Sequence, residues 1–290
     1  MSAATIPRNT RRHRPKQVVA SQTFLYILLA VIAIIYIFPF LIQIVTVFKT
    51  EADASAHPLS LIPTTWTGMW LDTLFRHSDF PRWFMNSAIV AVCVTLGRVF
   101  FNSLAGYALA RLHYRGRNAV FAGLVAVMSA PMVVLLIPRF LVLNILGIYD
   151  TYLGMILPLL VDCSGVIIMK GFFESIPVSI EEAARVDGAS IFRTFWSVVL
   201  PMARPALITI IILSFQGSWN ELSHFIVAAQ SPSLTTLTKG VAQLASGALG
   251  AGTQYPLKLA AASVMTIPVI VIFFIFQKRI MNVGEGAVKE

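Results

Sequence analysis

A polar stretch, Ser179–Gly188, has the clearest capacity for chemistry, and it lies between two apolar segments. Ser179 stands three residues before Glu182, the spacing at which a hydroxyl and a carboxylate each satisfy a free amide at a helix start. Gly188 can adopt the left-handed conformation that ends a helix. We therefore predict a short helix of about eight residues, roughly 12 Å long. Glu182, Arg185 and Asp187 are charged residues of this stretch.

A second amphipathic piece follows from Ile191 to Val199, and Pro201 is expected to end it. The two pieces together predict a helix-turn-helix on a loop at 173–204. Ala183 and Ala184 place small side chains on the first helix, which would permit close docking of a partner.

The spacing of this loop is specific. Three residues separate Glu182-Ala183-Ala184 from Gly188, nine residues separate Gly188 from Val198, and one residue separates Val198 from Leu200-Pro201. This pattern resembles the EAA motif of permease subunits in binding-protein-dependent ABC importers, with Val198 where the family has Ile. An ordinary capped surface helix would explain Ser179 and Gly188 but not the remaining spacing. The resemblance implies a coupling helix that docks on a cytoplasmic ATPase subunit, through Glu182, Ala183, Ala184, Arg185, Asp187, Gly188, Leu200 and Pro201.

The composition places the chain in a bilayer. Hydrophobic residues make up 57% and charged residues 12%, whereas soluble domains are about one quarter charged. The net charge of +9 does not indicate a nucleic-acid partner, because the cationic residues punctuate apolar runs rather than form a patch on a soluble face. Cys93 and Cys163 fall inside apolar runs without a CxxC or Cys/His cluster, so we predict neither a disulfide nor a metal site.

The apolar runs predict an all-α membrane protein with six spans in one permease domain, 23–278. A basic tail at 1–22 precedes this domain and a short tail at 279–290 follows it. Pro131 and Pro268 should kink the third and sixth spans. The expected spans are Phe24–Phe48, Phe84–Ala110, Ala119–Ile137, Tyr152–Phe172, Ala206–Ala229 and Leu257–Phe276.

An even number of spans puts both termini on one side of the membrane. Most of the 22 Lys and Arg residues then fall on the side of the termini and of the 173–204 loop. Because cytoplasmic loops carry the excess of Lys and Arg, we expect both tails and this loop to be cytoplasmic. The long segment 49–81 and the Gly-rich segment Gly247–Gly252 would then be external, the latter as an adjustable loop or a slack linker.

Three further segments carry the same resemblance. Leu104–Arg111 is similar to the end of the family's second conserved helix, and Trp219-Asn220-Glu221 with Thr236-Leu237 is similar to its fifth-helix segment. The closing Gly286–Lys289 resembles the tail of the maltose-type, carbohydrate-importing subfamily. The resemblance implies a type I ABC importer permease fold in a bacterial cell membrane. It also implies a second permease subunit, two ATPase subunits that hold ATP and Mg, and an extracytoplasmic solute-binding protein, with no cofactor in this chain.

Several polar residues fall at bilayer depth, where ionisable groups are costly and point to function. Arg98 and Asp162 lie near the centres of the second and fourth spans and could form a structural ion pair or contact the solute. Trp219, Asn220 and Glu221 in the fifth span could line the pathway of a polyhydroxylated solute. Their alternative is hydrogen bonding to neighbouring helices.

The sequence contains no GxxxxGK[ST] phosphate loop, no GxSxG and no HExxH, so we predict a transport subunit rather than an enzyme. An ion-coupled secondary transporter using Arg98, Asp162 and Glu221 is the alternative. That alternative leaves the spacing of the 173–204 loop unexplained, and a membrane-embedded enzyme would lack its nucleophile and base.

Overall fold

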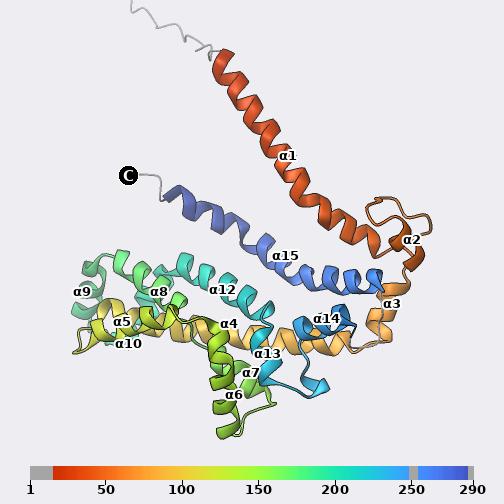
Figure 1. Cartoon of the computed structure of the whole chain (residues 1–290). Helices are drawn as coiled ribbons and strands as arrows, with labels where there is room; N and C mark the ends of the chain where they lie inside the picture. The colour runs from red at the N-terminus through yellow and green to blue at the C-terminus, as the bar shows by residue number, and fades with distance from the viewer. Residues whose placement is uncertain (1–15, 248–253, 287–290) are drawn as a thin grey trace, which may run out of the picture.

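The computed structural model describes residues 16–247 and 254–286, and every regular element in this part of the chain is a helix (Figure 1). The all-α prediction is therefore confirmed for these residues. Most of the predicted 1–22 tail, most of the Gly-rich segment and the last four residues lie outside the described residues. The helix that we expected to start at Phe24 already begins at Lys16.

Three helices are long and apolar enough to cross a membrane alone, over Thr23–Thr46, Phe80–Arg111 and Tyr255–Gln277. They lie in α1 (Lys16–Thr46), α4 (Phe80–Arg111) and α15 (Tyr255–Gly286). Three bent helix pairs bring the possible number of spans to six. Pro268 lies inside the last span, which is a continuous helix.

The bent pairs differ from the straight spans that hydropathy suggested. The first joins α5 (Arg117–Met128) to η1 (Met132–Leu135) and α6 (Leu136–Ile145) at 98°. The second joins α7 (Tyr152–Ile156) and η2 (Leu157–Leu159) to α8 (Cys163–Ser175) at 42°. The third joins α10 (Ile191–Thr194), η3 (Phe195–Val199) and α11 (Leu200–Met202) to α12 (Arg204–Trp219) at 80°.

Three of the predicted spans are accordingly interrupted, and the ends predicted for the third and fifth are wrong. Pro131 does more than kink the third span, because its extended backbone separates two helices and the second arm runs on to Ile145. The fourth span is interrupted just before Cys163. The fifth ends at Trp219, and α13 (Ser223–Ala228) starts after a break. Apolar residues continue up to the first two breaks, so a hydropathy run does not show them, whereas the third break coincides with the polar pair Asn220-Glu221.

The centre of the molecule is the group of α4, α8 and α12 (Figure 1). α9 (Val178–Val186) and α10 lie at one end of this group, whereas α3 (Met69–Arg76) and α14 (Leu237–Ser246) lie at the other. α1 and α15 approach each other near α2 (Glu51–Ala56) and diverge toward their far ends. A hydrogen bond of 3.1 Å from Gln43 to Ser263 joins them, while the apolar faces of α1 remain exposed.

Close approach of α4 and α8 requires a residue without a side chain. A Cβ at Gly106 would lie 2.6 Å from the Cβ of Met169 and 2.9 Å from the backbone nitrogen of Lys170. Backbone cannot yield as a flexible side chain can, so Gly106 fixes the distance between the two helices. Small residues allow such close approach between membrane helices.

We therefore expect Gly106→Ala to destabilise the protein by about 1–3 kcal/mol through overpacking. Gly123→Ala is the matched control, because Gly123 also lies inside a helix, α5, and a Cβ there meets nothing within 4 Å. The measurement is thermal unfolding of both variants in mild detergent. Equal melting temperatures would contradict this account of Gly106.

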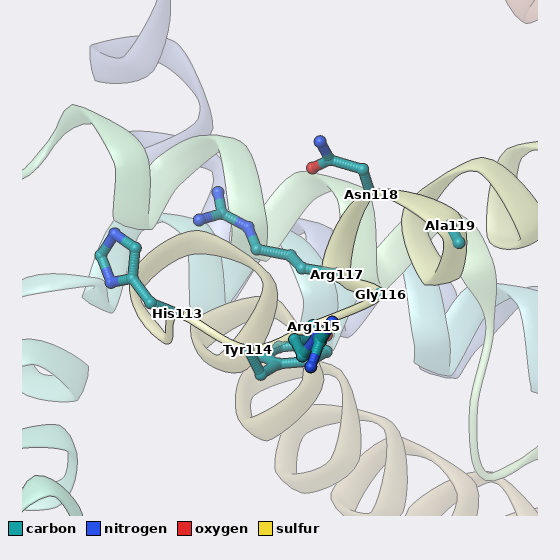
Figure 2. A pocket seen from close by; sticks show the side chains of 7 residues that line it. All are labelled: His113, Tyr114, Arg115, Gly116, Arg117, Asn118 and Ala119. Carbon is teal, nitrogen blue, oxygen red and sulfur yellow. The ribbon is translucent and has the colours of Figure 1, made fainter.

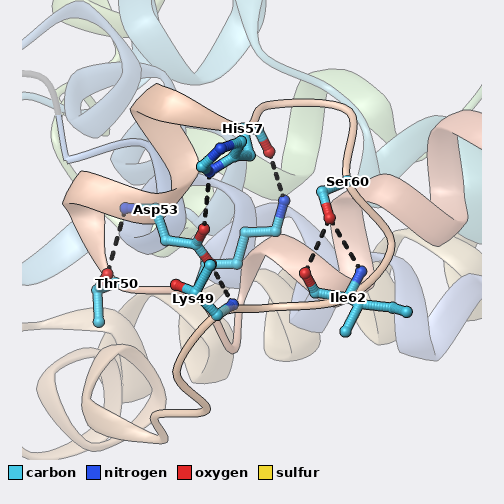
Figure 3. A network of polar contacts seen from close by, with 7 residues as sticks. Lys49, Thr50, Asp53, His57, Ser60 and Ile62 are labelled. Carbon is cyan, nitrogen blue, oxygen red and sulfur yellow. Dashed lines mark hydrogen bonds and ion pairs between the residues drawn. The ribbon is translucent and has the colours of Figure 1, made fainter.

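The segment that follows α1 is held by a compact polar network (Figure 3). Lys49 is fully buried and its Nζ donates to the His57 carbonyl at 2.7 Å. Asp53 accepts from the Thr64 amide at 2.9 Å and lies 3.3 Å from His57 Nδ1. The pKa of Asp53 lies below its ordinary value of 3.8, mainly because the carboxylate accepts the hydrogen bond from the Thr64 amide. Hydrogen bonds from neighbouring side chains and the charge of Lys49 lower this pKa further.

A carboxyl with a lowered folded-state pKa stabilises the fold above its unfolded pKa and loses this effect as the pH falls through the folded value. We expect the melting temperature to fall as the pH drops from about 5 to about 2, and to fall less in Asp53→Asn. Asp72→Asn is the control, because its carboxylate is half exposed in a pair with Arg76. A wild-type pH response in Asp53→Asn would refute this assignment.

Candidate functional site

The helix predicted at Ser179–Gly188 is α9, but it starts differently from the prediction. The residue that precedes its first turn is Pro177, and Ser179 lies inside the helix. No side chain caps this end, so the predicted Ser179 and Glu182 capping box is wrong. Pro177 has a fixed φ and no amide to satisfy, which allows the helix to begin earlier than the hydroxyl suggested.

The end of α9 agrees with the prediction. Gly188 has a φ of +79°. Its amide donates to the Arg185 carbonyl and the Ala189 amide donates to the Ala184 carbonyl, each at 3.0 Å. These two bonds form the Schellman motif. A Cβ at Gly188 would meet nothing within 4 Å, so this position requires glycine for its backbone conformation and not for packing.

The second helix of the loop does not stop at Pro201. It runs to Met202, and residues Phe195–Val199 form a π-helical turn. A proline removes the hydrogen bond to the preceding turn, and a wide π turn is one way a helix accommodates such a loss. Leu200 packs against the cluster around Tyr107 and Phe195, whereas Pro201 is exposed.

The coupling candidates on α9 lie mostly at the surface. Glu182, Ala183, Arg185, Asp187 and Gly188 are exposed, and Ala184 is half-buried. Sequence reasoning missed that apolar side chains share this surface. Val186 is 88% exposed, and Phe192 and Trp196 stack with their rings 6.3 Å apart. Exposed apolar residues beside charges are typical of a surface that a partner covers.

Glu181, which sequence reasoning passed over, is buried with 1% exposure. Its carboxylate lies 2.9 Å from Arg111 Nε and accepts from the Tyr107 hydroxyl at 3.1 Å. Arg185 approaches the same carboxylate at 3.9 Å. The neighbouring acids Glu181 and Glu182 therefore face opposite ways, the first toward α4 and the second outward. Helical periodicity alone could have suggested that these two point apart.

The predicted contact of Arg98 and Asp162 is present within this chain. Arg98 Nε lies 3.6 Å from Asp162 Oδ2 and donates to the Leu159 carbonyl at 2.7 Å. Asp162 caps the start of α8 by accepting from the Gly165 amide at 2.7 Å. Asn102, which is fully buried, donates to the same carboxylate at 3.0 Å. Thus α4 holds the break that precedes α8.

A small cavity of about 70 Å³ lies beside this pair. Ser164 and Ser214 line it together with Arg98 and Asp162, so its wall is partly polar. The cavity is large enough for water molecules but not for a sugar ring. Its position between α8 and α12 places the polar groups at an interface between helices of the central group.

The remaining pathway candidates separate in the structure. Trp219 is 1% exposed, donates to the Met265 carbonyl at 3.0 Å and stacks on Phe215, so it packs α12 against α15. Asn220 is exposed at the end of α12. Glu221 is half-buried and accepts from the His224 amide at 2.9 Å. The break after Trp219 therefore presents Asn220 and Glu221, while Trp219 supports it.

A basic turn between α4 and α5 forms an open concavity of about 510 Å³. Figure 2 shows Arg117 and Asn118 on one side of the turn and Tyr114 and Arg115 on the other. Gly116 takes a φ of +90° before α5. Arg117 also lies 3.7 Å from Glu174 on α8. Among the residues that the structure describes, no group of three or more His, Cys, Asp or Glu could hold a metal ion.

Comparison with known families decides which kind of protein this is. Residues 102–281, more than half of the chain, match the family described as "Binding-protein-dependent transport system inner membrane component". The chain belongs to this family. It is therefore an inner-membrane permease subunit of a binding-protein-dependent ABC transporter, and its role is transport rather than catalysis.

Three curated relatives are similar over most of their length. The chain is 32% identical over 269 residues to "Inner membrane ABC transporter permease protein YcjP" of Escherichia coli (strain K12), covering 90% of this chain and 94% of that protein. It is 32% identical to "Arabinooligosaccharides transport system permease protein AraQ" of Halalkalibacterium halodurans, with the same coverage. "Diacetylchitobiose uptake system permease protein NgcG" of Streptomyces coelicolor is 29% identical, covering 89% and 86%.

Solved structures show the same fold. A chain of a bacterial ABC transporter involved in the import of the acidic polysaccharide alginate superposes with a TM-score of 0.79 at 24% identity, covering 92% of this chain and 98% of that one. A chain of the alginate transporter in complex with a pentasaccharide-bound periplasmic protein gives 0.61 at 18% identity, covering 91% and 97%. The predicted permease fold is confirmed by these likenesses.

The charge contact at the α8 break leads to a prediction. Arg98→Gln or Asp162→Asn alone would leave a largely buried charge without its partner, which costs at least about 1–3 kcal/mol. The double variant removes both charges and should recover much of the stability lost in either single variant. Melting temperature and yield of folded protein in mild detergent measure this recovery.

The exposed pair of Arg82 and Asp79, 3.8 Å apart, is the control. Its corresponding Gln and Asn variants should each cost no more than about 1 kcal/mol, because exposed ion pairs contribute little. Additive losses at Arg98 and Asp162, without recovery in the double variant, would disprove the pairing.

Proposed function

We propose that this chain is one permease of an ATP-driven importer for a carbohydrate-type solute, coupled to a separate ATPase through α9. The observation that carries the coupling role is the outward face of α9. It combines Glu182, Arg185 and Asp187 with the exposed Val186, on a helix whose end is fixed by Gly188.

The solute class is supported by the relatives. Their names specify arabinooligosaccharides and diacetylchitobiose, and the superposable transporter imports alginate. These solutes are all saccharides. Polar residues near helix breaks, Asn220 and Glu221 in one place and Arg98 and Asp162 in another, would face such a solute or the water that accompanies it.

The proposed assembly has a second permease beside this chain. The apolar faces of α1 are exposed along most of its length, and the diverging ends of α1 and α15 leave the central group uncovered on that side (Figure 1). Lipid and a related permease would cover these surfaces. Two ATPase subunits would bind ATP and Mg on the cytoplasmic side, and the solute-binding protein would dock on the external side.

In the proposed mechanism, closure of the ATPase pair displaces α9 as a rigid body and turns the spans from inward- to outward-facing. Both tails and α9 would lie in the cytoplasm. An ion-coupled secondary transporter is less consistent with the structure, because Arg98 and Asp162 already lie close enough to offset each other's charge.

The first experiment purifies the tagged protein from its host in mild detergent and identifies bound proteins by mass spectrometry. We expect a phosphate-loop ATPase and a second permease with the wild type, and loss of the ATPase in Glu182→Lys. Asp72→Lys, on another exposed carboxylate, should retain it. Recovery of the chain alone, with transport that needs no ATP, would refute the proposal.

Gly188 offers a second prediction. Proline cannot adopt the φ of +79° at this position, because its ring fixes φ near about −65°. Gly188→Pro should therefore abolish ATP-driven uptake while membrane insertion remains. Gly188→Asn should keep part of the uptake, since asparagine tolerates the left-handed region. Uptake of the host's solute and the amount of membrane-inserted protein measure the two effects, and full uptake in Gly188→Pro would contradict the prediction.

A further inference from the structure

We infer that Glu181 is a positioning residue for transport, which locks α9 to α4 so that α9, α8 and α4 move as one body. This inference rests on the proposed coupling role of α9. It assigns different tasks to two neighbouring carboxylates: Glu182 would contact the ATPase, and Glu181 would hold the helix that carries Glu182.

The lock is built from a buried carboxylate, one hydroxyl donor and two ion-pair contacts. Glu181 Oε1 lies 2.9 Å from Arg111 Nε, and Oε2 accepts from the Tyr107 hydroxyl at 3.1 Å. The side chains of Arg111 and Glu181 are 9% and 1% exposed. Arg185, on α9 itself, contributes a weaker contact at 3.9 Å from an exposed position. The strongest partners of Glu181 thus come from α4.

Arg111 also bridges the connection between α8 and α9. Its Nη2 donates to the Phe173 carbonyl at 2.6 Å and to the Ile176 carbonyl, which lies closer still. These carbonyls belong to the last turn of α8 and the residue after it. One guanidinium therefore joins the end of α4, the end of α8 and the start of α9.

The surroundings of the lock exclude water. The Tyr107 ring meets the Phe173 ring edge-on at 5.7 Å, and the Phe195 ring lies 5.0 Å from it. Phe173 and Phe195 are each at most 2% exposed. Separating a charged pair in such surroundings costs much free energy, because each charge would stay buried without a partner. The pair therefore resists separation of α9 from α4 when a load acts on α9.

The other end of α8 is tied to the same helix. Asn102 and Arg98 hold Asp162 at the start of α8, and Gly106 lets the two backbones touch between these points. Arg98 and Arg111 are 13 residues apart on α4, which is about 20 Å along the helix. A displacement of α9 would accordingly move α4 and α8 with it, and so would also move the polar break before α8.

The experiment measures distances by pulsed electron paramagnetic resonance in the transporter purified from its host with its co-purifying subunits. Spin labels are placed at Val178→Cys on α9 and Leu96→Cys on α4, both exposed, after Cys93 and Cys163 are changed to serine. In the wild type we expect one narrow distance that is the same without nucleotide and after trapping with ATP and vanadate.

Glu181→Gln keeps the side-chain volume and removes the charge. We expect this variant to retain the ATPase subunit, to show a broadened distance that shifts on trapping, and to lose stimulation of ATP hydrolysis by the solute-bound binding protein. Glu182→Gln is the matched control. Its distance should remain narrow, whereas its binding of the ATPase weakens.

The outcomes separate the two proposals. Absence of any ATPase from the wild-type complex would reject the proposed function. An ATPase-bound Glu181→Gln complex with a narrow, unchanged distance and normal stimulation would overturn the lock alone. If Glu181→Gln does not assemble, the same distance is measured in Tyr107→Phe, which removes one hydroxyl but keeps the ion pair. A broadened distance in this variant supports the lock, and an unchanged distance overturns it.

Discussion

Two arginines on one long helix set the main electrostatic constraint of this structure. Arg98 and Arg111 lie on α4 in largely buried positions, and a buried cation is stable only with a partner. Their carboxylate partners, Asp162 and Glu181, stand just before α8 and in the first turn of α9. Because these two arginines need carboxylate partners, their pairing fixes where α8 begins and how α9 lies against α4. The route of the chain from α8 to α9 follows from these two contacts.

The breaks between helices are stabilised in the same way, by polar side chains that pair with free backbone groups. At the start of α8, the Asp162 carboxylate accepts from the Gly165 amide and from Ser164, and at the end of α8 Arg111 supplies donors to free carbonyls. Unsatisfied backbone groups are costly away from water. Asp162, one of the ionisable residues within the apolar runs, is therefore the side chain that allows the chain to break before α8. These side chains hold the breaks in place, so a movement of the helices at a break would also change any contact that the same side chains make with solute.

Sequence reasoning found the features that depend on local backbone chemistry or on charge. Gly188 was predicted because a helix end needs a left-handed residue, and Arg98 and Asp162 were paired because neither charge is tolerable alone. It failed where tertiary contacts decide. Ser179 has the right spacing for a cap, yet Pro177 starts the helix. Apolar residues flank the breaks at 129–131 and 160–162, and the polar pair Asn220-Glu221 was counted within the fifth span although the helix breaks there. Glu181 was overlooked because its burial depends on Tyr107 and Arg111, more than 60 residues earlier in the chain.

The surfaces left open are consistent with a chain that works only as part of an assembly. Val186, Phe192 and Trp196 expose apolar area beside charges at the end of the central group, and α1 exposes it along most of a span. The first surface is small and mixed, which suits a contact that must transmit force and tolerate movement. The second is long and uniformly apolar, which suits lipid or another membrane helix. α4 and its two ion pairs join α9 to the start of α8, so events at the small surface would act on the break in the fourth span.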